Sequence, residues 1–144
     1  MSEKTTPAIK TARLTYAGND AFVAEAQSGH AMVTSFGRGT GATSPMELVL
    51  VALGGCSGAD VVGILEKKRQ KVTGYDIEVR GERREEHPRI YTRIEVIHRV
   101  RGHAIDPKAV QHAIDLSEKK YCSVSAMLSA SAKLSMSFEI INEE

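Results

Sequence analysis

The sequence contains no tryptophan, and aromatic residues make up only 5% of its 144 positions. Proteins that bind single-stranded nucleic acid usually stack the bases on aromatic rings, so this composition disfavours that class. A charge excess is also lacking, because 19 Lys and Arg residues are balanced by 18 Asp and Glu residues. Dedicated nucleic-acid-binding domains carry a clear basic excess. We therefore expect no nucleic-acid partner.

Long uninterrupted apolar runs are lacking as well. The N-terminal residues MSEKTTPAIK contain no apolar segment of the kind found in secretory signals. The most apolar stretch, residues 48–65, is interrupted by glycines and by Asp60. We interpret it as a buried core helix and not as a membrane span. These features predict a cytoplasmic protein with no membrane partner.

The sequence has only two cysteines, Cys56 and Cys122, and they do not form a CxxC pair. A zinc site or a thioredoxin-type motif therefore has no support, and the five histidines show no ligand spacing. We expect no metal and no cofactor. In a reducing cytosol a structural disulfide is not expected, and lone cysteines there are most often small buried hydrophobes.

The composition that is present, 42% hydrophobic and 26% charged residues, is that of a globular protein. The length predicts a single domain over residues 1–144. Three short strands are expected, separated by turns rich in Gly, Asn, Asp and Ser, and followed by a glycine-rich loop. The strands cover residues 9–16, 21–27 and 32–36, and the loop covers residues 37–43.

Three signals agree on where a long helix begins. Ser44 suits the N-cap, Pro45 suits the first helical position, and Glu47 completes a capping box with Ser44. The helix is predicted to continue to about Gln70. Since residues 48–59 carry no charge, we expect this helix to be buried on every side, with a partner chain helping to cover it.

The remaining residues predict a hairpin, two helices and a last strand. Apolar and polar residues alternate over residues 75–80 and 93–100, which is typical of an antiparallel hairpin with one buried face. Asp106 and Pro107 begin a helix that ends near Tyr121; a short helix over 122–131 and a strand over 134–140 follow. The predicted fold class is α+β, with antiparallel strands in two groups and the long helix between them.

The glycines around Cys56 leave two interpretations open. Gly54, Gly55 and Gly58 each cost the helix about 1 kcal/mol relative to alanine. Such a cost is offset where another element or a ligand approaches closely. Either the helix packs tightly at this point, or something must reach the Cys56 sulfur. Asp60 lies one turn after Cys56 on the same helix face, where we expect a structural hydrogen bond.

Cys122 lies where one predicted helix ends and the next begins. The free N–H groups of a helix start lower the pKa of a thiol there, and the nearby Lys119 and Lys120 act in the same direction. Two such thiols suggest a redox pair. One thiolate attacks the O–O bond of a peroxide, and the resulting sulfenic acid condenses with the second thiol.

The run Thr43-Ser44-Pro45-Met46-Glu47-Leu48, the cysteine eight residues later, and Tyr121-Cys122-Ser123-Val124-Ser125 together resemble one known family. This is the superfamily of osmotically inducible protein C and organic hydroperoxide resistance proteins (OsmC/Ohr), and the chain resembles its OsmC-like branch. The order of elements fits over residues 8–141. The resemblance implies an intertwined α+β homodimer, with antiparallel sheets around a long central helix and active sites at the subunit interface.

For the chemistry, the resemblance implies that Cys56 is the peroxidatic cysteine and Cys122 the resolving one. It implies organic hydroperoxides as substrates, in oxidative-stress defence, and a dithiol such as a dihydrolipoyl protein as the reductant. Met46, Leu53 and Met127 are expected to line an apolar substrate pocket.

The sequence differs from the peroxidase pattern of this superfamily at two positions. Peroxidase members have an acidic residue directly after the proline, where this chain has Met46, and an arginine in the turn after the first strand, where it has Asn19 and Asp20. Glu47 and Arg38 are the candidates for these two roles.

Two other functions remain open. A non-catalytic OsmC-like protein would use the same interface pocket for a small lipophilic ligand, with the cysteines as packing residues. A thiol enzyme of another kind would use Cys56 as a nucleophile, although the sequence places no histidine as its base.

Overall fold

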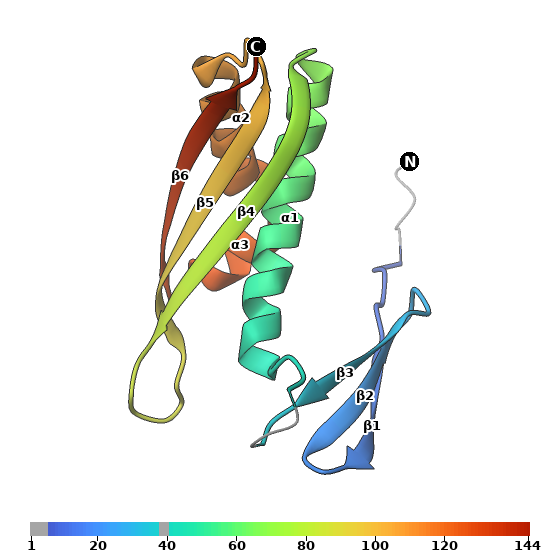
Figure 1. Cartoon of the computed structure of the whole chain (residues 1–144). Coiled ribbons are helices and arrows are strands. Elements are labelled where there is room, and N and C mark those ends of the chain that lie inside the picture. The colour runs from blue at the N-terminus through green and yellow to red at the C-terminus, as the bar shows by residue number, and fades with distance from the viewer. Residues whose placement is uncertain (1–5, 38–40) are drawn as a thin grey trace. The chain divides into compact units, whose positions relative to one another are not determined.

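The structure is a computed structural model that describes residues 6–37 and 41–144 (Figure 1). The chain forms two compact units, residues 1–48 and residues 49–144. The second unit contains both cysteines. Arg38, one of the two candidates for the activating residues, lies outside the described residues.

The first unit is a three-stranded antiparallel sheet in the order β1-β2-β3. Its strands are β1 (Ala12–Gly18), β2 (Ala21–Ala26) and β3 (Ala31–Ser35). Gly18, Asn19 and Asp20 form the first turn, and all three have positive φ angles, which glycine, asparagine and aspartate adopt most readily. The three predicted strands are confirmed, although the first begins at Ala12 and not at Ile9.

Helix α1 (Pro45–Lys67) begins with the predicted capping box. The Glu47 amide donates to the Ser44 hydroxyl at 3.2 Å, and the Ser44 amide donates to the Glu47 carboxylate at 2.9 Å. The pKa of Glu47 is lowered because the backbone amide and the side chain of Ser44 hydrogen-bond to the charged carboxylate. The two reciprocal bonds satisfy two backbone donors at the start of the helix.

In the second unit, α1 packs on a sheet in the order β4-β5-β6 (Figure 1). The strands are β4 (Lys71–Arg83), β5 (Tyr91–His103) and β6 (Lys133–Asn142). Between β5 and β6 the chain forms α2 (Pro107–Leu116), a π-helical turn η1 (Ser117–Tyr121) and α3 (Ser123–Leu128). Asp106 caps α2, its side chain accepting from the Lys108 amide at 2.9 Å.

The α+β class is confirmed, but one strand pair runs in the other direction. β4 and β5 form the predicted antiparallel hairpin, whereas β6 pairs with β5 in parallel, with Val96 opposite Met136. The alternation of apolar and polar residues predicts the last strand but not the direction in which that strand runs. Two helices and the π turn carry the chain from the end of β5 back to the start of that strand, and such a crossover gives parallel strands.

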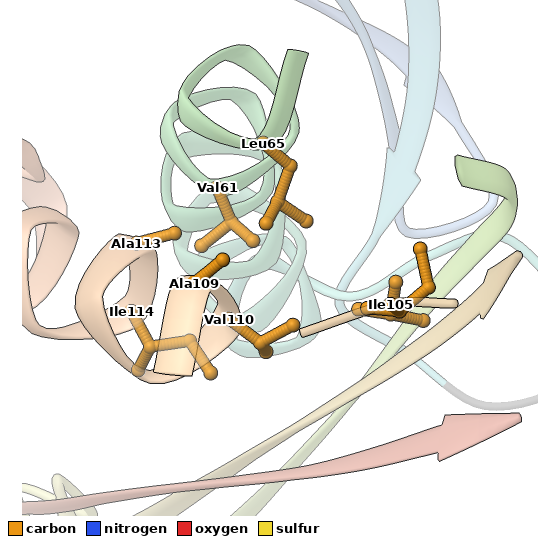
Figure 2. Packing of buried hydrophobic residues seen from close by; sticks show 8 residues of the cluster. Val61, Leu65, Ile105, Ala109, Val110, Ala113 and Ile114 are labelled. Atoms are coloured by element: carbon orange, nitrogen blue, oxygen red, sulfur yellow. The ribbon is translucent and has the colours of Figure 1, made fainter. Parts of the chain in front are cut away.

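The core of the second unit lies where α1, α2 and the sheet meet (Figure 2). Val61 and Leu65 of α1 are fully buried, as are Val110 and Ala113 of α2. Ile105 lies in the connection before α2 and closes the cluster. The side chains of β4, β5 and β6 that face this core alternate with mostly polar or charged ones on the other face, where Ile97 of β5 is a buried exception.

Within one chain, α1 is buried on one face only. Leu53, Val61 and Leu65 are fully buried, whereas Ala52 and Ala59 on the opposite face are exposed, as is Val51 near the start of the helix. Burial on every side therefore requires a partner chain and stays a prediction. By length and mean hydropathy α1 would also suit a membrane span, although a third of its most apolar window is buried inside the unit. Core helices of globular proteins show the same properties, so we keep the core-helix interpretation.

Candidate functional site: two cysteines between α1 and α3

Cys56 lies on α1 and is half-buried. The three glycines near Cys56 differ in how closely other side chains pack against them. A Cβ at Gly58 would overlap the Ile77 side chain of β4, and a Cβ at Gly54 would lie 3.2 Å from Val79 Cγ2. Gly55 faces open space, with no atom within 4 Å of the position a Cβ would take. Tight helix packing therefore explains Gly54 and Gly58, whereas Gly55 leaves space beside the cysteine.

Cys122 is the N-cap of α3 and is only 3% exposed. Its sulfur accepts a hydrogen bond from the Ser125 amide at 3.4 Å, as an N-cap side chain does. Its own amide donates to the Ser117 carbonyl at 2.7 Å, which closes the π-helical turn η1. The sulfur is thus held by the first turn of one helix, and the backbone by the end of the preceding one.

The structure brings the two thiols together. The Cys56 side chain lies close enough to the Cys122 thiol to raise its pKa, and both cysteines are free. Residues 66 positions apart in the sequence thus form one site, with Cys56 partly exposed to solvent and Cys122 behind it. Disulfide formation would require the two sulfur atoms to approach to about 2.05 Å.

The environment of Cys122 corrects one expectation from the sequence. The pKa of Cys122 is raised, because burial disfavours the charged thiolate. The Ser125 hydroxyl and amide act in the opposite direction, but they do not overcome burial, and Cys56 adds to the upward shift. Among the described residues the Ser125 hydroxyl has no other hydrogen-bond partner. The helix start therefore does not make Cys122 a reactive thiolate as predicted; the residue is kept as a protonated thiol.

Asp60 makes the predicted structural hydrogen bond. Its carboxylate accepts from the Ser117 hydroxyl at 2.8 Å, which joins α1 to the beginning of η1. The Ser117 hydroxyl also lies 3.5 Å from the Ser57 carbonyl. Ser117 was not recognisable from the sequence as a site residue. Only the helical register after the predicted N-cap at Asp106 could have placed it on the face towards α1.

The other predicted site residues are not brought to the thiols within the described part of the chain. The Glu47 carboxylate accepts from the Ser44 amide, and Glu47 precedes Cys56 by about two and a half helical turns. Leu53 is fully buried in the core, whereas Met127 is 76% exposed on α3. Met46 is half-buried at the start of α1. An activating role for Glu47, and a substrate pocket from the other three, stay predictions.

A different hollow lies between α1 and α2. It has a volume of about 450 Å³. Its lining includes the apolar residues Ala59, Ile64, Leu116 and Tyr121, with Lys67 and Lys68 at its edge. Asp60 and Tyr121 belong to this lining and lie four positions after Cys56 and one before Cys122, so the hollow adjoins the cysteine site. Among the described residues, no group of three or more His, Cys, Asp or Glu side chains could hold a metal ion.

Comparison with known proteins finds the same fold and one matching family. A family model described as "OsmC-like protein" matches residues 37–137. The chain is 42% identical over 130 residues to Protein YhfA of Escherichia coli K12, a match that covers 90% of this chain and 97% of that protein. It is 38% identical to a hypothetical protein from Aquifex aeolicus of known crystal structure, with a TM-score of 0.87, covering 96% of this chain and all of the other.

Structures of proteins with stated roles are more distant. The organic hydroperoxide resistance protein OhrB of Bacillus subtilis is 16% identical, with a TM-score of 0.61, covering 90% of this chain and 98% of that protein. At this identity the similarity shows the fold alone. The chemistry of this chain therefore has to be inferred from the two cysteines and their surroundings.

Proposed function

The chain belongs to the OsmC-like protein family, and from this premise we propose that it is a cysteine-based peroxidase that reduces organic hydroperoxides. Membership supports a role in hydroperoxide resistance in general terms. The observation that carries the specific proposal is the contact between a partly exposed Cys56 and a buried Cys122. A peroxidatic thiol has to meet its substrate, whereas a resolving thiol has to meet only the oxidised form of its partner.

In the first step, the Cys56 thiolate attacks the terminal oxygen of the hydroperoxide ROOH. The O–O bond breaks, Cys56 becomes a sulfenic acid, and the leaving alkoxide takes up a proton to give the alcohol ROH. The sulfur is oxidised by two electrons, and the peroxide is reduced by two. Gly55 beside Cys56 leaves room for the approach of the substrate.

In the second step, the Cys122 thiol attacks the Cys56 sulfenic acid. A Cys56–Cys122 disulfide forms and one water molecule leaves. The raised pKa of Cys122 suits this order of events, since a buried protonated thiol does not compete for the peroxide. A dithiol reductant, such as a dihydrolipoyl protein, then returns two electrons by thiol–disulfide exchange and is itself oxidised to a disulfide.

The open face of α1 supports the assembly that we propose for this function. Val51 is 64% exposed, and Ala52, Gly55 and Ala59 on the same helix are exposed as well. An apolar face of this kind in a small domain is typical of a protein–protein interface. A homodimer that covers this face would surround Cys56 with apolar side chains and so favour organic hydroperoxides over hydrogen peroxide. A cytoplasmic location remains part of the same proposal.

Peroxide consumption by single-cysteine variants tests the function. With cumene hydroperoxide and a dithiol reductant, Cys56→Ser is expected to abolish turnover. Cys122→Ser is expected to retain the first oxidation of Cys56 but to lose disulfide formation. A Cys56→Ser variant as active as the wild type would rule the proposal out.

The hollow between α1 and α2 favours a second candidate, a protein that binds a small lipophilic anion. Its volume of about 450 Å³ lies within the range of ligand sites, and it combines apolar walls with Lys67 and Lys68. Native mass spectrometry of the purified protein distinguishes the two functions. A bound ligand that is retained in Cys56→Ser, together with no peroxide consumption by the wild type, would favour the binding protein.

A further inference from the structure

We propose that Asp60 and Ser117 form a positioning pair that holds Cys122 against Cys56. The inference rests on the proposed two-cysteine chemistry and adds to it the residues that set the geometry of its second step. It begins from the observation that the middle of the crossover between β5 and β6 is joined to α1 by a polar contact near the thiols.

The contact is short and partly buried. Ser117 is fully buried, and its hydroxyl donates to the Asp60 carboxylate at 2.8 Å. A hydrogen bond to a charged acceptor is about twice as strong as one between neutral groups. The Ser57 carbonyl lies 3.5 Å from the same hydroxyl and is the weaker acceptor. The hydroxyl of Ser117 is therefore directed at α1 and fixes one point of η1 on that helix.

Backbone hydrogen bonds connect Ser117 to Cys122. The Ser117 carbonyl accepts the Cys122 amide at 2.7 Å, a bond that spans five residues and closes the π-helical turn. The Ser117 amide donates to the carbonyls of Ala113 and Ile114 at the end of α2. One residue thus joins α2, η1, α1 and the backbone of the buried cysteine. Single π-helical turns of this kind occur frequently at functional sites.

Two pairs of residues join α1 to the segment from Ser117 to Cys122. Asp60 lies one turn after Cys56 on the same face of α1, and Ser117 begins the turn that Cys122 ends. Asp60 meets Ser117, and Cys56 meets Cys122. Two contacts are needed to fix both the position and the rotation of the turn. The apolar packing of α2 on α1 sets the overall position of this segment, and the polar contact adds a fixed point next to the thiols.

This geometry governs the fate of the Cys56 sulfenic acid. It either condenses with Cys122, releasing water, or reacts with a second hydroperoxide. In that second reaction the sulfenic acid gains one oxygen to become a sulfinic acid, and ROOH becomes ROH. A misplaced Cys122 slows the first route and leaves the second unchanged. The positioning pair therefore determines how often a turnover ends in the disulfide and how often it ends in the sulfinic acid.

The test compares four variants by mass spectrometry of Cys56 after oxidation with cumene hydroperoxide. Ser117→Ala and Asp60→Ala remove the contact. Asp60→Asn keeps a hydrogen-bond acceptor without the charge, and Gln111→Ala removes an unrelated hydrogen bond on α2. We expect the ratio of sulfinic acid to disulfide to rise about tenfold in the two alanine variants, since small misplacements of reacting groups cost large rate factors. Gln111→Ala is expected to match the wild type, and Asp60→Asn, whose neutral acceptor makes a weaker bond, is expected to show a smaller rise than the alanine variants.

A merely structural role would not produce this pattern. The first oxidation, followed by trapping the sulfenic acid with dimedone, is expected to keep its wild-type rate in both alanine variants. If either variant does not fold, Asp60→Glu gives the same readout, because it keeps the charge and the acceptor but lengthens the contact by one methylene. An unchanged ratio in the folded contact-breaking variants would overturn the inference.

Oxidation with diamide separates this inference from the proposed function. Diamide takes two hydrogen atoms from two thiols, which gives a disulfide and a hydrazine, and no hydroperoxide is needed. Rapid Cys56–Cys122 disulfide formation in the wild type and slow formation in Ser117→Ala would support the positioning pair even if the protein did not react with hydroperoxides. Equal rates in both proteins would contradict it, whatever the peroxidase assay shows.

Discussion

At the scale of residues, burial separates the roles of the two thiols. Cys122 is 3% exposed and its pKa is raised by burial, whereas Cys56 is half-buried. Alkylating agents react with accessible thiolates, so both factors protect Cys122. The asymmetry follows from where each residue lies, one on a helix face beside Gly55 and one at a buried N-cap.

Limited alkylation with iodoacetamide at neutral pH checks this asymmetry. We expect Cys56 to be modified at least about tenfold faster than Cys122, because a reagent reaches only one of the two sulfurs and needs a thiolate there. In urea the two rates are expected to become similar. Faster modification of Cys122 in the folded protein would contradict the assignment of roles.

A second buried group, His98, has no place in the proposed chemistry but affects stability. It is fully buried on β5, and its Nδ1 lies 2.6 Å from the Tyr75 hydroxyl. Among the described residues, its Nε2 has no hydrogen-bond partner. Burial lowers the pKa of His98 to about 4 and raises that of Tyr75, so both side chains are neutral in the folded protein.

The depressed pKa of His98 predicts a loss of stability in mild acid. The unfolded chain binds this proton near pH 6.5 and the folded protein only near pH 4. The unfolded state therefore holds more protons between these values, and stability falls as the pH drops from 6.5 towards 4. The loss amounts to at most about 3 kcal/mol. Urea unfolding across this range is expected to show a weaker pH dependence in His98→Gln, whereas the exposed His112→Gln is expected to match the wild type.

At the scale of elements, the packing of α1 on β4 sets the position of Cys56. Gly58 and Gly54 bring the helix backbone close to Ile77 and Val79 of the strand. Leu53 and Val61 lie fully buried on the same face of the helix. This face fixes the rotation of α1, and the rotation directs Cys56 towards α3 and away from the sheet.

Alanine substitutions at two glycines of α1 test this packing. Gly58→Ala is expected to lower the free energy of unfolding by about 0–2 kcal/mol, because overpacking costs about 1–3 kcal/mol and helix propensity returns about 1 kcal/mol. Gly63→Ala, where a Cβ would meet no atom within 4 Å, is expected to be neutral or stabilising. Denaturant unfolding measures both. Equal effects of the two substitutions would contradict the close approach of α1 to β4.

The elements that could be predicted from the sequence are those with a local signal. Ser44, Pro45 and Glu47 predicted the start of α1, and period-two alternation predicted β4 and β5. The direction of β6 could not be predicted, because it depends on where the crossover helices return the chain. The contact of Asp60 with Ser117 was half predicted: the acid and its bond could be expected, but its partner is set by tertiary packing across 57 positions.

In the candidate site, too, local features could be predicted from the sequence and features set by tertiary packing could not. Cys56 and Cys122 could be recognised from their sequence motifs, but only the fold brings their side chains into contact. The lowered thiol pKa expected for Cys122 was wrong, because the sequence indicates the helix start and not the depth of burial. Local electrostatics can thus be anticipated from neighbouring residues, whereas desolvation depends on the whole core.

At the scale of the whole molecule, the exposed apolar face of α1 predicts a homodimer. We expect Val51→Asp to shift the protein towards monomers, because it introduces a charge into the centre of the proposed interface. Ser135→Asp on the exposed face of β6 is the matched control and is expected to leave the oligomeric state unchanged. Sedimentation velocity measures both. A wild-type protein that sediments as a monomer at high concentration would rule out the proposed interface.

The central claim is that Cys56 and Cys122 form a disulfide in response to an organic hydroperoxide. Peptide mapping under non-reducing conditions, after one equivalent of cumene hydroperoxide and rapid quenching, tests it most directly. We expect a peptide pair joined through Cys56 and Cys122, formed faster than with one equivalent of hydrogen peroxide. If both thiols remain reduced over many minutes with either peroxide, the peroxidase account is wrong.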